Sequence, residues 1–267
     1  MPRNLLLAIG VIFVGILAFD MMGILVRMLG GSYPVMQIAA LRNFFGVIPA
    51  LILLWHSRQF SALPRINRPR FHLINLVRSS SVVMAQLCFY TALTKIEFAT
   101  AGALGFSGPM FITALSVPFL GHRIGIWRWG AVFLGFAGVV TIMQPFQDGF
   151  SHYMVLPVIA AFCYATSSVL VRFYPPEIPS AAIQFGQQIA TCALATMVVI
   201  LFVDPVPIAD LGDAGLFVIM GALGGTGVLS LAIAYRLADP SSVSPFEYFG
   251  IPVSFALGWL FFAEAPF

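Results

Sequence analysis

Four ionisable residues stand inside long apolar stretches of this 267-residue chain. They are Asp20, Arg42, Arg78 and Glu247. Charged groups in such surroundings are costly, and they are usually paired or functional. A carboxylate or guanidinium group there can form an ion pair, hold a charged ligand or, for the carboxylates, carry protons. Each of these chemistries requires apolar helices that bring the groups to the same depth.

Asp20 and Arg42 lie on consecutive apolar runs, at similar distances from the turn that joins them. At a rise of about 1.5 Å per helical residue their depths match, so the sequence predicts an ion pair between them. Such a pair could lock the hairpin, exchange partners with a charged substrate, or close an outer gate. Stability alone is a weak motive, because burying two charges can cost as much free energy as their attraction returns.

Arg78 and Glu247 match in depth near the other membrane face, and a pair between them would form an inner gate. Arg78 could instead extend its charge to the lipid headgroups. Glu247 lies between Pro245 and Pro252, which free backbone carbonyls inside the apolar run. Broken helices are tolerated where they line a cavity, so Glu247 and Tyr248 are the strongest candidates for a binding site.

Further polar and aromatic side chains are expected near the middle of the runs. The candidates for substrate binding are Gln86, Tyr90, Ser107, Tyr164, Gln184 and Gln187, together with Glu247 and Tyr248. Each one alone could simply form an interhelical hydrogen bond. Together they favour a wet cavity in which tyrosines stack on a planar or cationic group and Glu247 selects positive charge.

Composition indicates that a membrane surrounds these groups. Hydrophobic residues make up 60% of the chain, charged residues only 9%, and the mean hydropathy is +0.98. A soluble domain carries about 25% charged residues, so this chain could not cover a water-facing surface. The three cysteines all fall in apolar runs, which favours free thiols over disulfides or a metal site. We expect no metal and no cofactor.

Runs of about 20 apolar residues are long enough to cross a bilayer. They predict helices at 4–28, 33–55, 72–94, 98–120, 127–144, 153–173, 180–203, 214–236 and 242–263. The segments that begin at Tyr90 and Tyr235 are alike, because each has a polar break followed by an apolar run with a central proline, Pro109 or Pro252. An internal duplication of this kind is typical of secondary transporters, whose binding site lies between the halves.

Positive charge predicts the orientation. The N-terminus and the loops after the even-numbered helices hold nine arginines, whereas the opposite side holds only Arg27 and Lys95. This asymmetry places the N-terminus in the cytoplasm. With five helices in the first repeat, the second repeat must enter the membrane inverted. We therefore predict repeats at 1–145 and 150–267, with helices 6–9 in the second and a tenth helix that this sequence lacks.

Several segments resemble the EamA-type drug/metabolite transporter superfamily. They are LGGSYPVMQIAALRNFFGVIP at 29–49, YTALTKIEFATAGALGFSGPMFITALSVPFLG, RWGAVFLGFAGVVTIMQP and AIAYRLADPSSVSPFEYFGIPVSFALGWLFFAEAP. The resemblance is greatest to the subgroup of S-adenosylmethionine uptake carriers and the human SLC35G group. It implies an all-α integral membrane fold of two inverted five-helix repeats, a central cavity and alternating access. His122 stands where the family usually has an acid at the end of the fourth helix.

These features predict a secondary transporter of the bacterial inner membrane. Its expected substrate is a small polar metabolite, either an amino acid, S-adenosylmethionine or a similar zwitterion or cation. The alternative is an organic anion or a vitamin such as riboflavin. Asp20 and Glu247 are the carboxylates inside the membrane that could couple protons. The expected partners are the substrate, the lipid bilayer, protons and a second copy of the chain, and not nucleic acid.

Two further classes compete with transport. One is a membrane scaffold that moves no substrate. The other is an intramembrane serine protease, because Gly105-Phe106-Ser107-Gly108 is similar to the sequence around the nucleophile of rhomboid proteases. Such a serine needs a histidine base within hydrogen-bond distance. The four histidines all lie at helix ends or in loops, so the sequence predicts that Ser107 has no base and that the chain is not an enzyme.

Overall fold

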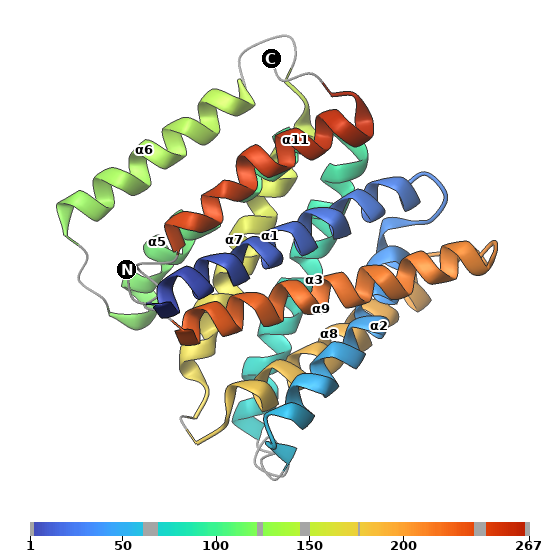
Figure 1. Cartoon of the computed structure of the whole chain (residues 1–267), viewed down its shortest axis with the longest axis horizontal. Helices are drawn as coiled ribbons and strands as arrows, with labels where there is room; N and C mark the ends of the chain where they lie inside the picture. Colours follow the sequence, from blue (N-terminus) through green and yellow to red (C-terminus); the bar gives the residue numbers. More distant parts are fainter. Residues whose placement is uncertain are drawn as a thin grey trace.

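Helices make up nearly all of the chain that we describe, in a computed structural model covering residues 3–60, 69–121, 125–144, 150–175, 177–237 and 244–264 (Figure 1). No strand occurs within these ranges. The α-helices are α1 (Arg3–Leu29), α2 (Val35–His56), α3 (Pro69–Lys95), α4 (Phe98–Gly105), α5 (Gly108–Leu120), α6 (Ile126–Met143), α7 (Val155–Leu170), α8 (Ser180–Phe202), α9 (Leu211–Leu237) and α11 (Gly250–Phe262). Three 3₁₀ turns adjoin them, η2 (His152–Met154), η3 (Val171–Phe173) and η4 (Ser244–Phe249).

Length and composition make these helices membrane spans. Among the described residues, seven helical segments are long and apolar enough to cross a bilayer, and Trp129–Met143 and Phe246–Phe262 are shorter apolar helices. Their order follows the sequence prediction, so the all-α integral membrane fold is confirmed. All three cysteines are free thiols.

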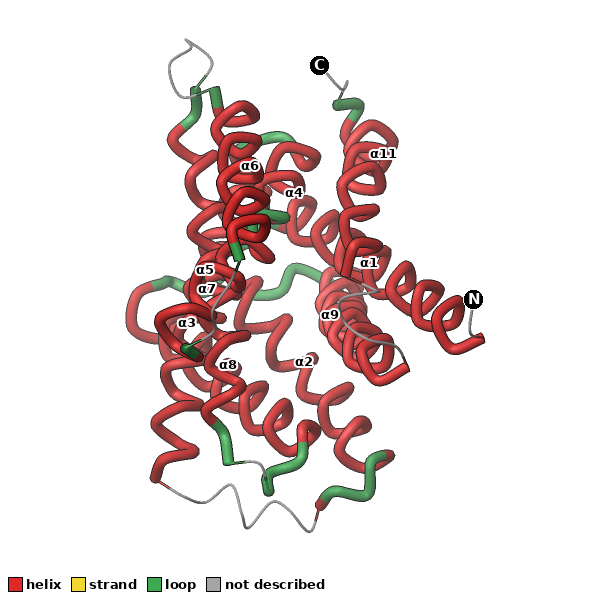
Figure 2. Tube along the Cα trace, turned by 90° about the vertical axis from the view of Figure 1, so that its left-hand side faces the viewer, coloured by secondary structure: helices red, strands yellow, loops and turns green. Residues whose placement is uncertain are grey.

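Helices from the two ends of the chain interleave in the bundle. α1 lies along α9, and α3 lies along α7 (Figures 1 and 2). α2 packs against both α8 and α9, whereas α6 contacts mainly α5. If the second predicted repeat has the same helix order as the first, α7 corresponds to α1 and α9 corresponds to α3. The α1–α9 pair then corresponds to the α7–α3 pair, as a two-fold relation between the predicted repeats would give.

Two of the predicted helices are broken. The predicted helix 98–120 divides at Phe106–Ser107 into α4 and α5, because Pro109 has no N–H to continue the α-helical ladder. The predicted helix 242–263 likewise consists of η4 followed by α11, which starts at Gly250. The breaks face each other, since the Gly250 backbone contacts the Phe106 ring. Close packing of the Phe106 ring against the second break therefore depends on a glycine at 250.

The α2–α9 contact uses the small-residue motif that the sequence places at Gly221-x-x-x-Gly225. Gly221 lies so close to α2 that a Cβ atom there would stand 2.8 Å from the Phe45 carbonyl carbon and 2.9 Å from the Gly46 nitrogen. Gly225 packs in the same way on the ring of Pro49. The two glycines thus let α2 and α9 approach each other closely.

Replacing Gly221 with alanine should therefore lower the free energy of unfolding by roughly 1–3 kcal/mol, because the new methyl group meets backbone atoms that cannot rotate away. Unfolding of the purified protein in mixed micelles measures the change. Gly215→Ala on the same helix is the matched control, since a Cβ atom at Gly215 meets nothing within 4 Å. Equal losses in the two variants would show that the close contact is not responsible.

Candidate functional site

Asn43 is the centre of a buried polar cluster that joins three helices. Its side chain is fully buried on α2, and it donates to Gln86 Oε1 (2.7 Å) and accepts from Gln86 Nε2 (3.2 Å) on α3. Arg42 Nη1 also donates to Asn43 Oδ1 (2.9 Å), and Gln188 Nε2 of α8 donates to the Asn43 carbonyl (2.9 Å). Sequence reasoning missed Asn43, although its position beside Arg42 at mid-helix was the available signal.

Tyr90 and Tyr164 lie beside this cluster. Tyr90 follows Gln86 by one turn of α3 and is almost completely buried. Tyr164, on α7, lies in the neighbourhood of Tyr90 and Arg42. Helices α2, α3 and α7 thus bring four of the predicted residues into one region, namely Arg42, Gln86, Tyr90 and Tyr164.

Tyr164 faces the inside of the bundle and yet is 39% exposed. The lipid-facing side of α7 carries Ile159 and Phe162, which are exposed apolar residues. Tyr164 follows Phe162 by two residues, which turns it roughly 200° away on an α-helix. Its neighbours on the inner face, Ala161 and Ala165, are buried. Tyr164 is therefore a partly accessible residue on the side of α7 that points away from Phe162.

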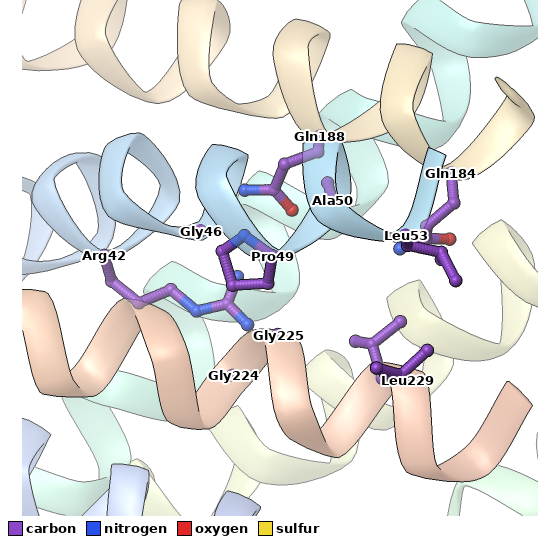
Figure 3. Close-up of a pocket in the computed structure, with 11 residues that line it drawn as sticks. Arg42, Gly46, Pro49, Ala50, Leu53, Gln184, Gln188, Gly224, Gly225 and Leu229 are labelled. Carbon is purple, nitrogen blue, oxygen red and sulfur yellow. The ribbon is translucent and has the colours of Figure 1, made fainter. Parts of the chain in front are cut away.

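Arg42 lies at one end of a narrow cleft between α2, α8 and α9 (Figure 3). Its guanidinium group rests directly on the backbone of Gly224. Gln184 and Gln188 line the opposite wall from α8, so Gln184 falls in this cleft as well. The cleft has room for about 20 Å³, enough for roughly one water molecule or one small polar group.

The predicted ion pair between Asp20 and Arg42 is absent. Asp20 Oδ1 accepts a hydrogen bond from Ser254 of α11 (3.0 Å), and Asp20 Oδ2 is buried with no hydrogen-bond partner. The prediction assumed that a short connection keeps α1 and α2 side by side. Instead α1 packs along α9 and α2 packs between α8 and α9, so matching depths do not bring the two side chains together.

Arg78 forms a second buried cluster rather than a pair with Glu247. Its Nε donates to the Ser167 carbonyl of α7 (2.9 Å), and its Nη1 donates to the Tyr174 hydroxyl (3.4 Å). The Ser167 carbonyl is open to Arg78 because α7 tightens there into η3, where the N–H of Val171 bonds to Ser168. The predicted Arg78–Glu247 gate is therefore wrong for this structure.

Two neighbours stabilise the Arg78 cluster. Tyr174 donates to Asn75 Oδ1 (3.1 Å), and burial raises the pKa of Tyr174, which keeps this donor protonated. Gln187, a predicted substrate ligand, donates to Ser167 Oγ (3.2 Å). Arg78 and Gln187 thus tie α3 and α8 to α7, and the structure gives neither residue a contact with the Asn43 cluster.

The remaining predicted residues lie at the helix breaks. Ser107 is buried at the α4–α5 break and donates to the Leu104 carbonyl (2.8 Å), not to a histidine. Glu247 and Tyr248 belong to η4, where the Tyr248 ring packs against Phe106 with 6.2 Å between ring centroids. Within the described part of the chain, the ring contact of Tyr248 is with Phe106 and not with the Asn43 cluster. Ser107 therefore has a structural contact that explains it without catalysis.

An ion pair that sequence reasoning missed joins α1 to α11. Arg27 and Glu264 approach to 2.5 Å, the only ion pair within the described residues, and Arg27 also lies 4.3 Å from the centroid of the Phe262 ring. Glu264 Oε2 accepts the N–H of Phe98 at the start of α4 (2.8 Å). These contacts hold helices α1, α4 and α11 together at one end of the bundle.

Comparison with known proteins places this architecture in a family. The model of the EamA-like transporter family matches residues 5–144. A riboflavin transporter of Rhizobium johnstonii is 29% identical over 77% of this chain and 66% of its own length. The pseudopaline exporter CntI of Pseudomonas aeruginosa is 28% identical over 93% of this chain and 85% of its own. An S-adenosylmethionine uptake transporter of Rickettsia felis is 22% identical over 99% and 87%.

A crystal structure of another protein shares the fold, with a TM-score of 0.67 at 21% identity over 97% of this chain and 90% of the other. The helical membrane fold and the buried polar clusters are both consistent with the match to a transporter family. The matched residues cover more than half of the chain. The chain belongs to the EamA-like transporter family and is a membrane transporter of small molecules.

Proposed function

We propose that this transporter is a secondary carrier that moves a small polar metabolite across the bacterial inner membrane by alternating access. The two repeats are residues 1–145 and 150–267, the N-terminus is cytoplasmic, and the substrate binds between the repeats. The observation that carries the proposal is the buried polar cluster of Arg42, Asn43, Gln86 and Gln188 inside an apolar bundle. We propose that water reaches this region at Tyr164, which is 39% exposed. A water-accessible polar site inside an apolar bundle serves transport better than it serves a scaffold.

In this proposal the site has a central part beside the Asn43 cluster and a second part farther from that cluster. Gln86, Tyr90 and Tyr164 form the central part, where the two rings stack on a planar group and the amide binds its polar edge. Glu247 and Tyr248 supply the distant part and select positive charge, while Ser107, Gln184 and Gln187 support the walls. Arg78 holds α3 and α7 together at the inner end.

A zwitterion or cation such as S-adenosylmethionine fits this chemistry, because it combines a planar ring with charged groups. Three relatives are named S-adenosylmethionine uptake transporters, which supports this choice. Riboflavin is the second candidate, since its planar ring also suits the two tyrosines and three relatives are named riboflavin transporters. We further propose that protons drive the transport through Asp20, and that the carrier works as a homodimer.

Uptake into proteoliposomes tests the transport of these molecules. S-adenosylmethionine, an amino acid mixture and riboflavin should be compared with empty liposomes, in parallel with thermal unfolding of the purified protein. A true substrate is expected both to accumulate and to raise the unfolding temperature, because it binds the folded state. Failure of every molecule in both measurements would favour the scaffold.

Cysteine labelling tests the position of the site. In a background without Cys88, Cys163 and Cys192, Tyr164→Cys should react at least about tenfold faster with a charged thiol reagent than Phe162→Cys, because the reactive thiolate forms only in contact with water. Phe162 is the matched control, as it lies on the lipid-facing side of the same helix. Equal rates would contradict a water-accessible space at Tyr164.

A further inference from the structure

Arg42 is a buried cation whose charge no neighbouring carboxylate balances. Its side chain is only 7% exposed, and the one hydrogen bond that it makes to a described residue goes to Asn43, a neutral amide. Its Nε atom is completely buried and has no hydrogen-bond partner in the part of the chain that the structure describes. The one ion pair in the described part of the chain involves Arg27, not Arg42.

An arrangement of this kind is expensive unless an anion completes it. A guanidinium group cannot lose its proton in a protein, so Arg42 stays charged in the bundle. Burial of an unpaired charge costs several kcal/mol even after relaxation. Asn43 accepts three hydrogen bonds, from Gln86, Gln188 and Arg42 itself, and these hydrogen bonds hold the charge in place.

Lipid headgroups do not explain Arg42. The lipid-facing side of α2 carries Phe44 and Ile48, which are 61% and 54% exposed. Arg42 precedes Phe44 by two residues and therefore points roughly 200° away, into the bundle. There the guanidinium lies flat on Gly224, where the absence of a side chain leaves room for it, and it faces the cleft toward α8 (Figure 3).

We propose that Arg42 is the subsite for a carboxylate of the transported molecule. The guanidinium provides the charge and a fork of N–H donors that matches a carboxylate, and Gln184 and Gln188 border the same cleft. Asn43 acts as a positioning residue that fixes the guanidinium. The cleft holds about 20 Å³, which suits a carboxylate group better than the larger phosphate.

This inference rests on the proposed transport function and narrows its substrate class. The substrate carries a carboxylate, so it is a zwitterion or an organic anion and not a simple cation. Among the candidates above, amino acids and S-adenosylmethionine meet this requirement, whereas riboflavin, which has no carboxylate, does not.

Acetate is the probe for the subsite. We expect sodium acetate to raise the midpoint of thermal unfolding of the purified protein by roughly 2–5 °C at saturation. Sodium pivalate has the same charge but a bulky tertiary group, and acetamide has the same shape but no charge, so neither should produce this shift. Equal shifts with acetate and either control in the unaltered protein would overturn the proposal.

Two substitutions of arginine give the decisive comparison. Arg42→Gln should abolish the acetate shift, whereas Arg172→Gln, which removes the same charge from an exposed position, should retain it. Retention of the shift in Arg42→Gln would overturn the proposal. If Arg42→Gln does not fold, Arg42→Lys serves instead: a weaker shift supports the subsite, and an unchanged shift rejects it.

The acetate measurement is independent of transport. Binding of acetate at Arg42 in a protein that moves none of the tested metabolites would reject the transport proposal and keep the anion subsite. Uptake of S-adenosylmethionine with no acetate shift would keep transport and reject the subsite.

Discussion

Asn43→Leu should lower the free energy of unfolding by roughly 2–4 kcal/mol, since it leaves buried hydrogen-bonding groups of Gln86 and the Arg42 guanidinium without partners. Leucine is close to asparagine in size, so little of the loss would come from a cavity. Unfolding in mixed micelles measures the stability, and uptake should fall with it because the Arg42 guanidinium loses its fixed position. Thr141→Leu on α6 is the control, because Thr141 is exposed and bonds only to its own helix.

A double-mutant cycle isolates the central pair. Gln86→Leu alone should also be destabilising, but the double variant should lose less than the sum of the two, because replacing both partners leaves fewer polar groups unsatisfied. A coupling of about 1–2 kcal/mol is expected, near the upper end for hydrogen bonds between membrane helices. Additive losses would mean that the Asn43–Gln86 hydrogen bonds carry little energy.

The helices could be predicted because they depend on local sequence. An apolar run of sufficient length must form its backbone hydrogen bonds internally, so its bounds follow from composition alone. The polar residues Gln86, Tyr90 and Tyr164 could be assigned to the interior for a similar reason, since lipid offers them no partner. The burial of Gln86 and Tyr90 is therefore a consequence of the same rule.

Neighbours could not be predicted from depth. Depth gives the height of a residue along the membrane normal, but not which helix it faces. Asp20 and Arg42 match in height, yet α1 packs against α9 and α11, whereas α2 packs against α8 and α9. Arg27 and Glu264 were missed for a related reason. At the ends of helices their charges were interpreted as marks of orientation, and only the fold brings the two ends together.

The helix breaks were foreseen only in part. Pro109 and Pro252 marked the two segments, but a proline can kink a helix without interrupting it. The interruption at Phe106–Ser107 also depends on the opposite segment, where Gly250 gives space to the Phe106 ring. That contact joins residues from opposite ends of the chain, which a local pattern does not contain.

Asp20→Asn should abolish uptake driven by a pH gradient, with a fall of at least about tenfold, while exchange of substrate across the membrane continues. Asp20 has one oxygen bonded to Ser254 and another that is buried without a hydrogen-bond partner among the described residues, so binding a proton would remove a buried charge that only one donor stabilises. A carboxylate placed in this way inside the membrane is a strong candidate for proton coupling. Asparagine resembles the protonated acid permanently and cannot release its proton.

The pattern of effects separates coupling from structure. Ser254→Ala removes the hydrogen bond but keeps the carboxylate, so driven uptake should persist. Glu97→Gln, at the connection between α3 and α4, removes a carboxylate outside the membrane spans and should change nothing.

Proteoliposomes with an imposed pH gradient measure driven uptake, and preloaded liposomes measure exchange. If Asp20→Asn lowers expression, exchange and driven uptake equally, Asp20 only stabilises the contact between α1 and α11. If driven uptake survives, another group carries the proton. Selective loss of driven uptake is expected because α1 and α11 belong to different proposed repeats. Protonation of Asp20 at their contact would therefore change the relative populations of the inward-open and outward-open states.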